Sequence, residues 1–365
     1  MYMRTIRDLG QLTGKTVLVR VDFNVENADD ALRLRRSMPT IRHLLGGGAK
    51  VLLISHRGRP AGKVVPELSL EFAMPFLREH LGSVVSFISD FDFGKIMEQL
   101  SSAKDSSLFL LENIRFLPQE EAMDIEFAKE LASLGDIYVN DAFAVSHHPS
   151  VSVSVLPTIL RPYAGLLLDS EIIHLTRAME EPAQPLVVVV AGGKAVDKFA
   201  VIKNLYKAAD KFLVGGILGN SFLKDRGVDV GSSHVDPEIT NQIHELLHDP
   251  KIIVPEDWIA DEAGTILDMG PISRKKFAEV LIKAKTVIWN GPLGKFEDPR
   301  YRAGSRAVAD AIIASGAFSV VGGGETTQFL LEEKLADDFT FLSTGGGAML
   351  DYLAGKDLPG ITVLR

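Results

Sequence analysis

Residues 186–198 read LVVVVAGGKAVDK, and this stretch indicates how the chain folds. Five consecutive large apolar residues are typical of a strand that is covered on both faces, as in a parallel sheet. Two glycines and Lys194 follow, and helical spacing of apolar residues then predicts a helix over residues 197–212. The predicted apolar face of this helix comprises Phe199, Ile202, Leu205, Ala209 and Phe212. A strand, a glycine turn and a helix in this order predict one part of an open α/β sheet.

The same alternation of short apolar runs and helical stretches extends in both directions. Further runs of the strand type occur at residues 16–21, 50–54, 108–111, 137–139, 212–214, 251–254, 286–289 and 318–321. Between them lie amphipathic stretches such as residues 124–133. There Asp124 is a suitable N-cap, and Ile125, Ala128, Leu131 and Ala132 share one face. The pattern predicts an α/β chain of two Rossmann-like domains with mainly parallel sheets, joined by a hinge helix.

The length of the chain also predicts two domains. At 365 residues it exceeds the ~250–300 residues that one hydrophobic core usually spans. We place the boundary at a helix near residues 169–181, because Pro182 and Pro185 stop that helix before the next strand. The predicted parts are a first domain of residues 1–167, a hinge helix and linker of residues 168–185, and a second domain of residues 186–352.

Composition and charge argue against several classes of protein. The chain has 46% hydrophobic and 24% charged residues, as globular proteins do, and its net charge of −9 disfavours nucleic-acid binding. No apolar run approaches the ~20 residues of a membrane helix, and the charged start MYMRTIRDL does not resemble a secretory signal. With 0 cysteines, the chain has no thiol nucleophile and no cysteine-bound metal, and we expect a cytoplasmic protein.

The first half of the chain is rich in arginine. Residues 1–165 hold 12 arginines and 6 lysines, whereas residues 166–365 hold 7 and 14. Arginine binds anions in a fixed geometry, and ligands of parallel sheets sit at the carboxyl ends of strands. The polar residues that follow predicted strands here include Asp22, Asn24, His56, Arg57, Arg59, Arg115 and His148. Each residue taken alone is more often a solvated loop residue or a clamp on a backbone carbonyl, but the agreement of four strand ends leads us to expect an anion pocket.

The second half carries glycine-rich loops where the first half carries arginines. Residues 192–194, 322–326 and 343–347 each combine glycines with the expected start of a helix. Glycines let the backbone approach a phosphate, and a helix start favours an anion. Lys194 and Lys198 are unfavourable at a helix start unless something negative binds there. We therefore expect a nucleotide phosphate site, although neither a Walker-type loop nor an early G-x-G-x-x-G is present.

Residues 244–248, HELLH, match the zinc-protease pattern and suggest a zinc hydrolase as an alternative. On a helical wheel, however, both histidines point away from the apolar face, which comprises Ile239, Ile243, Leu246 and Leu247. We therefore expect His244 and His248 to face solvent, and we treat the match as accidental.

Taken together, the loops resemble the phosphoglycerate kinase family along nearly the whole chain. The matching stretches, in order, are VRVDFNV, SHRGRP, LLENIRF, NDAF, GGKAVDK, WNGPLGKFE, GGGET and STGGGA. The resemblance implies a monomeric, hinge-bending enzyme of glycolysis that transfers a phosphoryl group between 1,3-bisphosphoglycerate and MgADP, giving 3-phosphoglycerate and MgATP. It also implies that the first domain, with the carboxyl-terminal tail 353–365, binds the acid and that the second binds the nucleotide.

The resemblance assigns roles to residues of the first domain. Arg33 falls where the family has its catalytic arginine. The residues that would bind the phosphorylated acid are Asp22, Phe23, Asn24, Arg33, His56, Arg57, Gly58, Arg59, Arg115 and His148.

In the second domain, Lys194 and Gly346 join Arg33 as catalytic residues, with the backbone of residues 345–347 facing the moving phosphoryl group. The residues that would bind the nucleotide are Lys194, Lys198, Gly215, Gly216, Asn290, Glu297, Gly323, Gly324, Glu325 and Thr326. Glu325 would hold Mg²⁺ with ADP or ATP, directly or through water.

Several positions depart from the family pattern. His148 stands where the family usually has arginine, so we expect weaker and more pH-dependent binding of the acid, which Arg57 could compensate. Glu325 replaces the usual aspartate. The loop 26–31 is short, which makes Arg35 the alternative to Arg33. These departures leave open a second hypothesis, a binding or regulatory relative without turnover.

Overall fold

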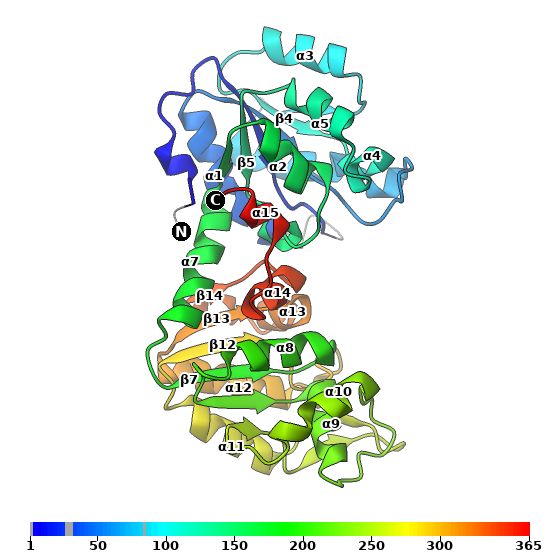
Figure 1. Cartoon of the computed structure of the whole chain (residues 1–365), viewed down its shortest axis with the longest axis vertical. Helices are drawn as coiled ribbons and strands as arrows, with labels where there is room; N and C mark the ends of the chain where they lie inside the picture. Colours follow the sequence, from blue (N-terminus) through cyan, green and yellow to red (C-terminus); the bar gives the residue numbers. More distant parts are fainter. Residues whose placement is uncertain (1–2, 26–31, 83–84) are drawn as a thin grey trace. The chain divides into compact units, whose positions relative to one another are not determined.

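The computed structural model describes residues 3–25, 32–82 and 85–365. Contacts divide the chain into two units, Met1–Ile172 with Asp357–Arg365, and Ile173–Lys356. Each unit contains a parallel six-stranded sheet with helices packed on it (Figure 1). The predicted α/β architecture with two mainly parallel sheets is thereby confirmed. The loop 26–31, on which the choice between Arg33 and Arg35 partly rested, lies outside the described residues.

The first unit is built on a sheet with strand order β3-β4-β2-β1-β5-β6. Its helices and strands are β1 (Thr16–Arg20), α1 (Leu32–Gly46), β2 (Lys50–Ile54), α2 (Met74–Leu81), β3 (Val85–Ile88), α3 (Phe93–Ser102), β4 (Leu108–Leu111), α4 (Pro118–Glu121), α5 (Ile125–Ala132), β5 (Ile137–Asn140), the π-helical segment η6 (Val151–Val155), α6 (Leu156–Ile159), β6 (Pro162–Ala164) and α15 (Pro359–Thr362). On β1, Val17 and Val19 pack toward α1 and α2, whereas Leu18 packs toward α3, α5 and α6. This burial on both faces explains the continuous apolar runs, since each buried aliphatic side chain stabilises the fold by about 1.5–3 kcal/mol.

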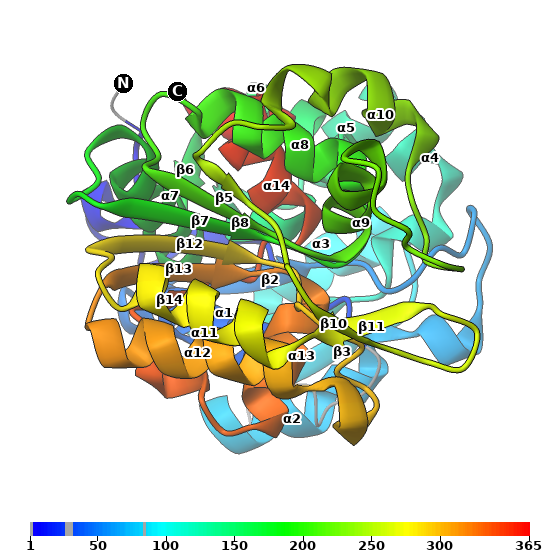
Figure 2. The same ribbon diagram turned by 90° about the horizontal axis from the view of Figure 1, so that it is seen from below.

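The second unit has the strand order β14-β13-β12-β7-β8-β9. Its helices and strands are β7 (Leu186–Val190), α8 (Ala195–Leu205), β8 (Lys211–Val214), α9 (Gly216–Asp225), α10 (Pro237–Ile243), β9 (Ile252–Ile253), β10 (Trp258–Ala260), β11 (Ile266–Met269), α11 (Pro271–Leu281), β12 (Thr286–Asn290), α12 (Ala303–Ser315), β13 (Phe318–Gly322), α13 (Gly324–Glu332), β14 (Phe341–Leu342) and α14 (Gly347–Leu353). Helices α8, α9, α10 and α14 cover one face of the sheet, and α11 and α12 cover the other (Figure 2).

All the predicted strands are present with boundaries within one residue, but two helix predictions need correction. The helix predicted over residues 197–212 ends at Leu205, because the Lys251 ammonium donates to the carbonyls of Tyr206 and Ala209 and the chain turns into β8. In α5, Asp124 caps the helix as expected, but Ile125 is 61% exposed, and Phe127 takes its place in the core. The strands β3, β6, β10, β11 and β14 were not predicted.

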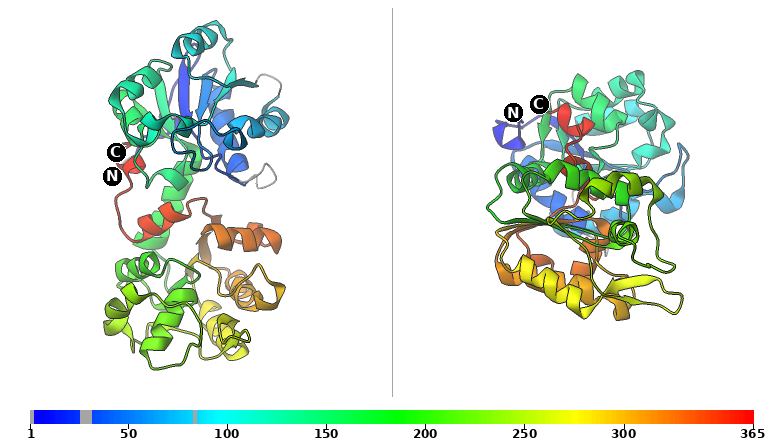
Figure 3. Two further views of the ribbon diagram at one scale, coloured as in Figure 1. Left: turned by 90° about the vertical axis from the view of Figure 1, so that its right-hand side faces the viewer. Right: turned by 60° about the horizontal axis from the view of Figure 1, so that its bottom comes forward.

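Helix α7 (Leu166–Glu180) begins in the first unit and ends in the second, and the division between units falls inside it. It starts three residues earlier than the sequence predicted, because the side chain of Asp141 accepts the N–H groups of Leu167 and Leu168. The carboxyl-terminal segment with α15 belongs to the first unit and lies beside η6 (Figure 3). There Asn140 Nδ2 donates to the carbonyl oxygen of Gly360 at 2.9 Å.

Asp141 is an unusual cap because it is fully buried. The Thr40 hydroxyl also donates to its carboxylate, but its Oδ2 has no hydrogen-bond partner among the described residues, and the buried Glu171 lies nearby. Burial raises the pKa of Asp141 to about 7, and the charge of Glu171 adds to the rise. Since the folded state holds this proton more tightly than the unfolded state, the contribution of Asp141 to stability is lost as the pH rises toward 7.

Replacing Asp141 with asparagine removes this titration while keeping the acceptor oxygen. The free energy of unfolding of Asp141→Asn, minus that of the unaltered chain, should therefore grow by up to about 1.4 kcal/mol per pH unit between about pH 4.5 and 6.5. Urea unfolding across this range measures the difference. The exposed Asp337, changed to asparagine, is the control and should give a flat line. A flat line for Asp141→Asn as well would show that Asp141 holds no additional proton.

Candidate active site

In the first unit, three neighbouring parallel strands end at one edge of the sheet. Asp22 follows β1, His56 follows β2, and Arg115 follows β4 in the short helix η4 (Ile114–Phe116). Arg33, in the first turn of α1, donates from Nη1 to the carbonyl oxygen of Asn24 at 3.0 Å, and the same nitrogen lies 2.9 Å from Asp22 Oδ2. Asp22 thus holds the guanidinium of Arg33 at the strand ends. Arg35, the alternative candidate, is exposed.

His56 lies among several cations. Its ring is only 2% exposed, and burial, followed by the charges of Arg20, Arg115, Arg33 and His148, lowers its pKa well below the usual value. His56 is therefore neutral at pH 7, while the arginines around it keep their charge. A neutral hydrogen-bonding ring surrounded by guanidinium groups is suited to bind a small anion. The expected grouping of Arg33, His56, Arg115 and His148 is present in the structure.

Not every candidate of the first unit points to this pocket. The Arg57 guanidinium donates to the carbonyls of Val25 and Glu67 and lies 4.2 Å from the ring centre of Phe72. These contacts hold neighbouring chain segments together. Phe23 is fully buried beneath the site, and its N–H donates to Ser55. Arg57 is thus poorly placed to compensate for His148.

The remaining candidates of this loop do line the strand ends. Gly58 has φ +63° and donates its N–H to Asn24 Oδ1 at 2.9 Å, which fixes the turn after β2. Arg115 Nη1 donates to the carbonyl of Gly58 at 3.0 Å and pairs with Glu121, and its charge interacts with that of Arg59. Arg59 and His148 are both exposed. The cluster thus combines hydrogen-bonded side chains with the solvent-exposed Arg59 and His148.

Sequence analysis missed Arg20 as a member of this site. It is the last residue of β1, only 1% exposed, and its Nη2 lies 3.1 Å from His56 Nδ1. An arginine at the end of an apolar strand, one residue before the polar turn, was the signal available, and its position within VRVDFNV obscured it.

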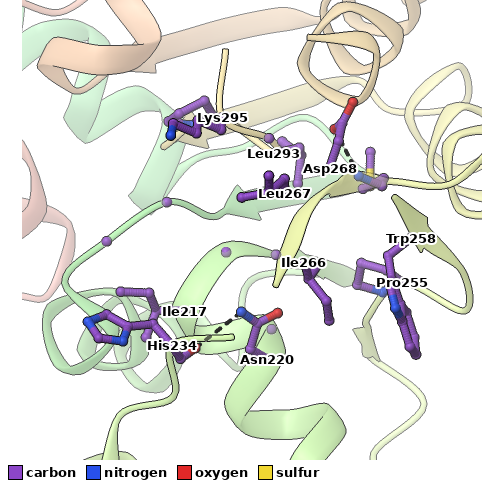
Figure 4. A pocket seen from close by; sticks show the side chains of 18 of the residues that line it. Ile217, Asn220, His234, Pro255, Trp258, Ile266, Leu267, Asp268, Leu293 and Lys295 are labelled. Carbon is purple, nitrogen blue, oxygen red and sulfur yellow. Dashed lines mark hydrogen bonds between the residues drawn. The ribbon is translucent and has the colours of Figure 1, made fainter. Parts of the chain in front are cut away.

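In the second unit, a pocket of about 290 Å³ is walled by glycine backbone and by apolar side chains. Figure 4 shows Leu267 and Leu293 on one side of it and Ile217 on the other. A Cβ on Gly216, which has φ +57°, would lie 2.2 Å from the Gly192 nitrogen, and one on Gly291 would lie 1.8 Å from the Ala191 oxygen. Narrow apolar walls of this kind suit a flat, planar ring such as a nucleobase.

A second pocket of about 210 Å³ shares Gly193 and Glu325 with the first. It is lined by Lys194, Lys198, Asn290, Gly323, Gly324, Thr326, Gly346 and Gly347, among others. Asn290 is 3% exposed, and its Nδ2 has no partner among the described residues. A buried donor without a partner is costly unless a ligand accepts from it. Together with two lysines, it makes this pocket suitable for phosphate groups.

Lys198 is buried in the first turn of α8, and its ammonium donates to the Gly193 carbonyl. Burial lowers its pKa to about 8, a shift that the charge of Glu325 opposes and that of Lys194 reinforces. An arriving phosphate would favour the protonated form of Lys198. The Thr326 hydroxyl accepts the N–H of Gly291 at 2.8 Å and so holds the two loops together.

The remaining candidates of this unit divide between the two pockets. Gly215 and the exposed Glu297 line the larger one. The hairpin β10–β11, which sequence analysis missed, supplies Trp258, Ile266 and Leu267 to the same pocket. The turn 261–265, in which Asp261 accepts the N–H groups of Ala263 and Thr265, was the signal that could have revealed it.

Two observations concern metals. No group of three or more histidine, aspartate or glutamate side chains positioned to hold a metal occurs in the described part of the chain. His244 and His248 are exposed, as expected, and α10 has already ended at Ile243. Glu325 is a single exposed carboxylate beside the phosphate pocket, which suits Mg²⁺ carried by a nucleotide, because this ion needs one or two carboxylates besides phosphates and water.

Comparison with known proteins places this geometry in context. The model of the family described as phosphoglycerate kinase matches residues 6–356. Phosphoglycerate kinases from Dictyoglomus turgidum and Dinoroseobacter shibae are each 40% identical to the chain, and the alignments cover 100% of both sequences. The solved phosphoglycerate kinase structures from Coxiella burnetii (33% identity, TM-score 0.87, 100% of this chain and 99% of that one) and Pyrococcus horikoshii (31%, 0.88, 99% and 98%) share the fold.

The described residues also contain no helix that is long and apolar enough to cross a membrane.

The glycine walls yield a test of the nucleotide pocket. Gly216→Ala should abolish the rise in melting temperature that MgADP produces, because its Cβ would collide with the backbone of Gly192. Gly227→Ala is the matched control, since Gly227 also has positive φ, +82°, but its Cβ would meet nothing within 4 Å. The control should cost about 1 kcal/mol of stability and retain the response to MgADP. A full response in Gly216→Ala would place the nucleotide elsewhere.

Proposed function

The chain belongs to the phosphoglycerate kinase family, and we propose that the two anion pockets described above carry the reaction of that family in this chain. The reaction transfers a phosphoryl group between 1,3-bisphosphoglycerate and ADP, giving 3-phosphoglycerate and ATP in glycolysis. The observation that carries the proposal is that the carboxyl ends of the parallel strands carry a cluster of arginines around His56 in the first unit and a lysine-lined pocket in the second.

The first unit would bind the phosphorylated acid. Arg59 and Arg115 supply positive charge for its phosphate, and His56 offers a hydrogen-bonding ring within the pocket. Asp22 and Asn24 orient the glycerate part and, through Asp22, hold Arg33 toward the acid's carboxyl group. Gly58 keeps the turn close to these groups.

The second unit would bind the nucleotide. Gly215, Gly216 and the apolar walls receive the base, and Glu297 at the edge of the pocket contacts the ribose. Lys194, Lys198 and the Asn290 amide face the phosphates, with the backbone of Gly323 and Gly324 beside them. The free Nδ2 of Asn290 supports this assignment, because a phosphate oxygen would satisfy it.

Magnesium would enter with ADP or ATP. Glu325 is the residue that would hold it, directly or through water, and Thr326 fixes the loop next to it. When bound, the ion supplies positive charge to the phosphates and lowers the repulsion among their oxygens. Lys198, which lines the same pocket, contributes a charge of the same sign when protonated.

The chemistry requires positioning rather than a general base. The carboxylate of 3-phosphoglycerate is ionised at pH 7, and phosphoryl transfer passes through a loose transition state whose charge lies on the equatorial oxygens. Arg33, Lys194 and the N–H of Gly346 are the groups that would stabilise that charge. Because the acid and the nucleotide bind to different units, transfer requires the units to close, and α7 with the linker through residue 185 is the hinge.

We further propose that the chain acts as a cytoplasmic monomer. Both ligands are small molecules; the two nucleotide-side pockets are lined by second-unit residues alone, and the arginines around His56 all come from the first unit, so that neither site needs a second copy of the chain.

Arg33 is the residue whose loss tests the mechanism. In a coupled assay with 3-phosphoglycerate and MgATP, the chain should turn over, and Arg33→Ala should lower kcat by about 100-fold or more while MgATP binding is retained. Arg35→Ala, two residues along the same helix and exposed, is the matched control and should keep full activity. Loss of activity in Arg35→Ala alone would transfer the role to Arg35. Absence of turnover in the unaltered chain would favour the binding-protein hypothesis.

His148 should make binding of the acid depend on pH. Arginine keeps its charge across this range, whereas histidine as a residue type does not, so the KM for 3-phosphoglycerate should rise by about two- to fivefold from pH 5.5 to 8. The substrate's phosphate also ionises in this range, so His148→Arg serves as the control, and the ratio of the two KM values isolates the histidine. A ratio that stays constant across the range would contradict this expectation.

A further inference from the structure

Four buried side chains of the first unit form a continuous chain of hydrogen bonds behind the anion pocket. Glu120, Ser152, Arg20 and His56 are 1%, 0%, 1% and 2% exposed. The Ser152 hydroxyl donates to Glu120 Oε1 at 2.6 Å, and the Ser152 N–H donates to Oε2 at 3.0 Å. Arg20 Nε donates to the same hydroxyl at 2.9 Å, and Arg20 Nη2 lies 3.1 Å from His56 Nδ1.

The direction of this chain is fixed by the arginine. A guanidinium has only donors, so Nδ1 of His56 must accept the bond from Arg20 and cannot carry a proton of its own. The single proton of the neutral ring then sits on Nε2. The described part of the chain offers no hydrogen-bond partner to Nε2, which leaves this donor available to a ligand.

The arginine is itself held by the rest of the chain. Its Nη1 donates to the Val21 carbonyl at 2.5 Å, and no carboxylate of the described residues lies within 4 Å of its guanidinium. The Ser152 hydroxyl, which accepts from Arg20 and donates to Glu120, links the positive charge of Arg20 to the carboxylate of Glu120. Ser152 lies in the π-helical segment η6, a rare conformation that often marks functional sites. Burying a cation without a direct partner lowers stability, which argues that the arrangement serves the site.

We propose that Glu120, Ser152 and Arg20 are positioning residues that hold His56 as the neutral Nε2–H tautomer, so that His56 meets the phosphorylated acid as an uncharged hydrogen-bond donor. The identity of the ligand rests on the proposed function, whereas the tautomer does not. The acid is recognised by charge from the arginines and by a directional N–H from His56. The two contributions are separate, and the N–H persists at every pH at which the ring stays neutral.

The surroundings of His56 favour the neutral ring. The charged and titratable groups that act on His56 itself are Arg20 of β1, Arg33 of α1, Arg115 of η4 and His148 of the loop after β5. Its partner Arg20 also lies near Tyr138 of β5 and Glu120 of α4. Those next to the ring are cationic or become so on protonation, and they act with burial to keep the pKa of His56 low. Glu120, the carboxylate at the far end of the hydrogen-bonded chain, is three hydrogen bonds away from the ring, through Ser152 and Arg20.

Nitrogen NMR of the full chain with labelled histidine reads the tautomer directly, without substrate or turnover. Between pH 5.5 and 8, His56 should show a protonated Nε2 and an unprotonated Nδ1 that do not change, with exposed rings such as His244 as the reference for solvated histidine. Detection of the Nδ1–H form, or of a doubly protonated ring in this range, would overturn the proposal.

Arg20→Met removes the donor to Nδ1 while keeping an extended side chain of similar length. In this variant His56 should show a mixture of tautomers and should titrate between pH 5.5 and 8. Tyr138→Phe is the matched control, because Tyr138 is also buried and donates to the backbone oxygen of Ser152, outside the chain of bonds to His56. The control should lose stability but leave the His56 signals unchanged. If Arg20→Met does not fold, Ser152→Ala, which removes the acceptor for Arg20 Nε, should give the same mixture in weaker form.

An unchanged His56 in every folded variant would show that burial alone sets the tautomer and would overturn the role of the positioning residues. Adding 3-phosphoglycerate should shift the Nε2–H signal of the unaltered chain. If the coupled assay shows turnover and this signal does not move, His56 is not the donor to the acid. In a His148→Arg background, Arg20→Met should also raise the KM for 3-phosphoglycerate at pH 8 by about tenfold and make it pH-dependent, with the KM for MgATP unchanged.

Discussion

The glycine-walled pocket of the second unit depends on backbone segments that cross too closely to leave room for a Cβ. Gly216 passes the backbone of Gly192, and Gly291 passes Ala191, where β8, β7 and β12 end side by side. These crossings are possible only because the three strands are parallel and in register. The register of the sheet therefore sets how closely the glycine segments approach one another, and with it the width of the pocket.

The two units solve the problem of holding an anion in different ways. The first keeps guanidinium groups in place with fixed hydrogen bonds, such as Arg115 to Gly58 and Arg33 to Asn24, so that little is lost when the ligand orders them. The second uses glycine backbone and a buried lysine whose pKa of about 8 makes its charge depend on what is bound. Fixed guanidinium groups would suit one small acid, whereas a lysine whose charge responds to its surroundings would suit a ligand with two or three phosphates, in line with the roles we propose for the two units.

Sequence analysis could predict those features that depend on residues close together in the chain, and it missed those that depend on contacts between distant residues. The strands buried on both faces were found because their apolar runs are continuous, and the edge strands β3 and β6 were missed because they are short and contain Ser86 and Pro162. Apolar residues keep their helical spacing up to residue 212, although the helix ends at Leu205. The Lys251 ammonium, which is distant in sequence, binds the carbonyls that follow the helix, and this contact could not be read from the local pattern. Arg57 and Arg20 could not be distinguished by pattern either, because both are arginines near strand ends. Only the fold directs Arg57 to backbone carbonyls and Arg20 to the ring of His56.

Two buried titratable groups of the first unit, His56 and Asp141, contribute to folding stability with opposite dependence on pH. The pKa of His56 is lowered from 6.5, so protonation below that pH opposes the folded state, and its contribution is lost as the pH falls. The pKa of Asp141 is raised from 3.8 to about 7, so its contribution is lost as the pH rises. Between these values each group offsets part of the other's effect. A neutral histidine among arginines and a carboxyl group at the start of α7 can therefore coexist in one domain without a steep dependence of stability on pH.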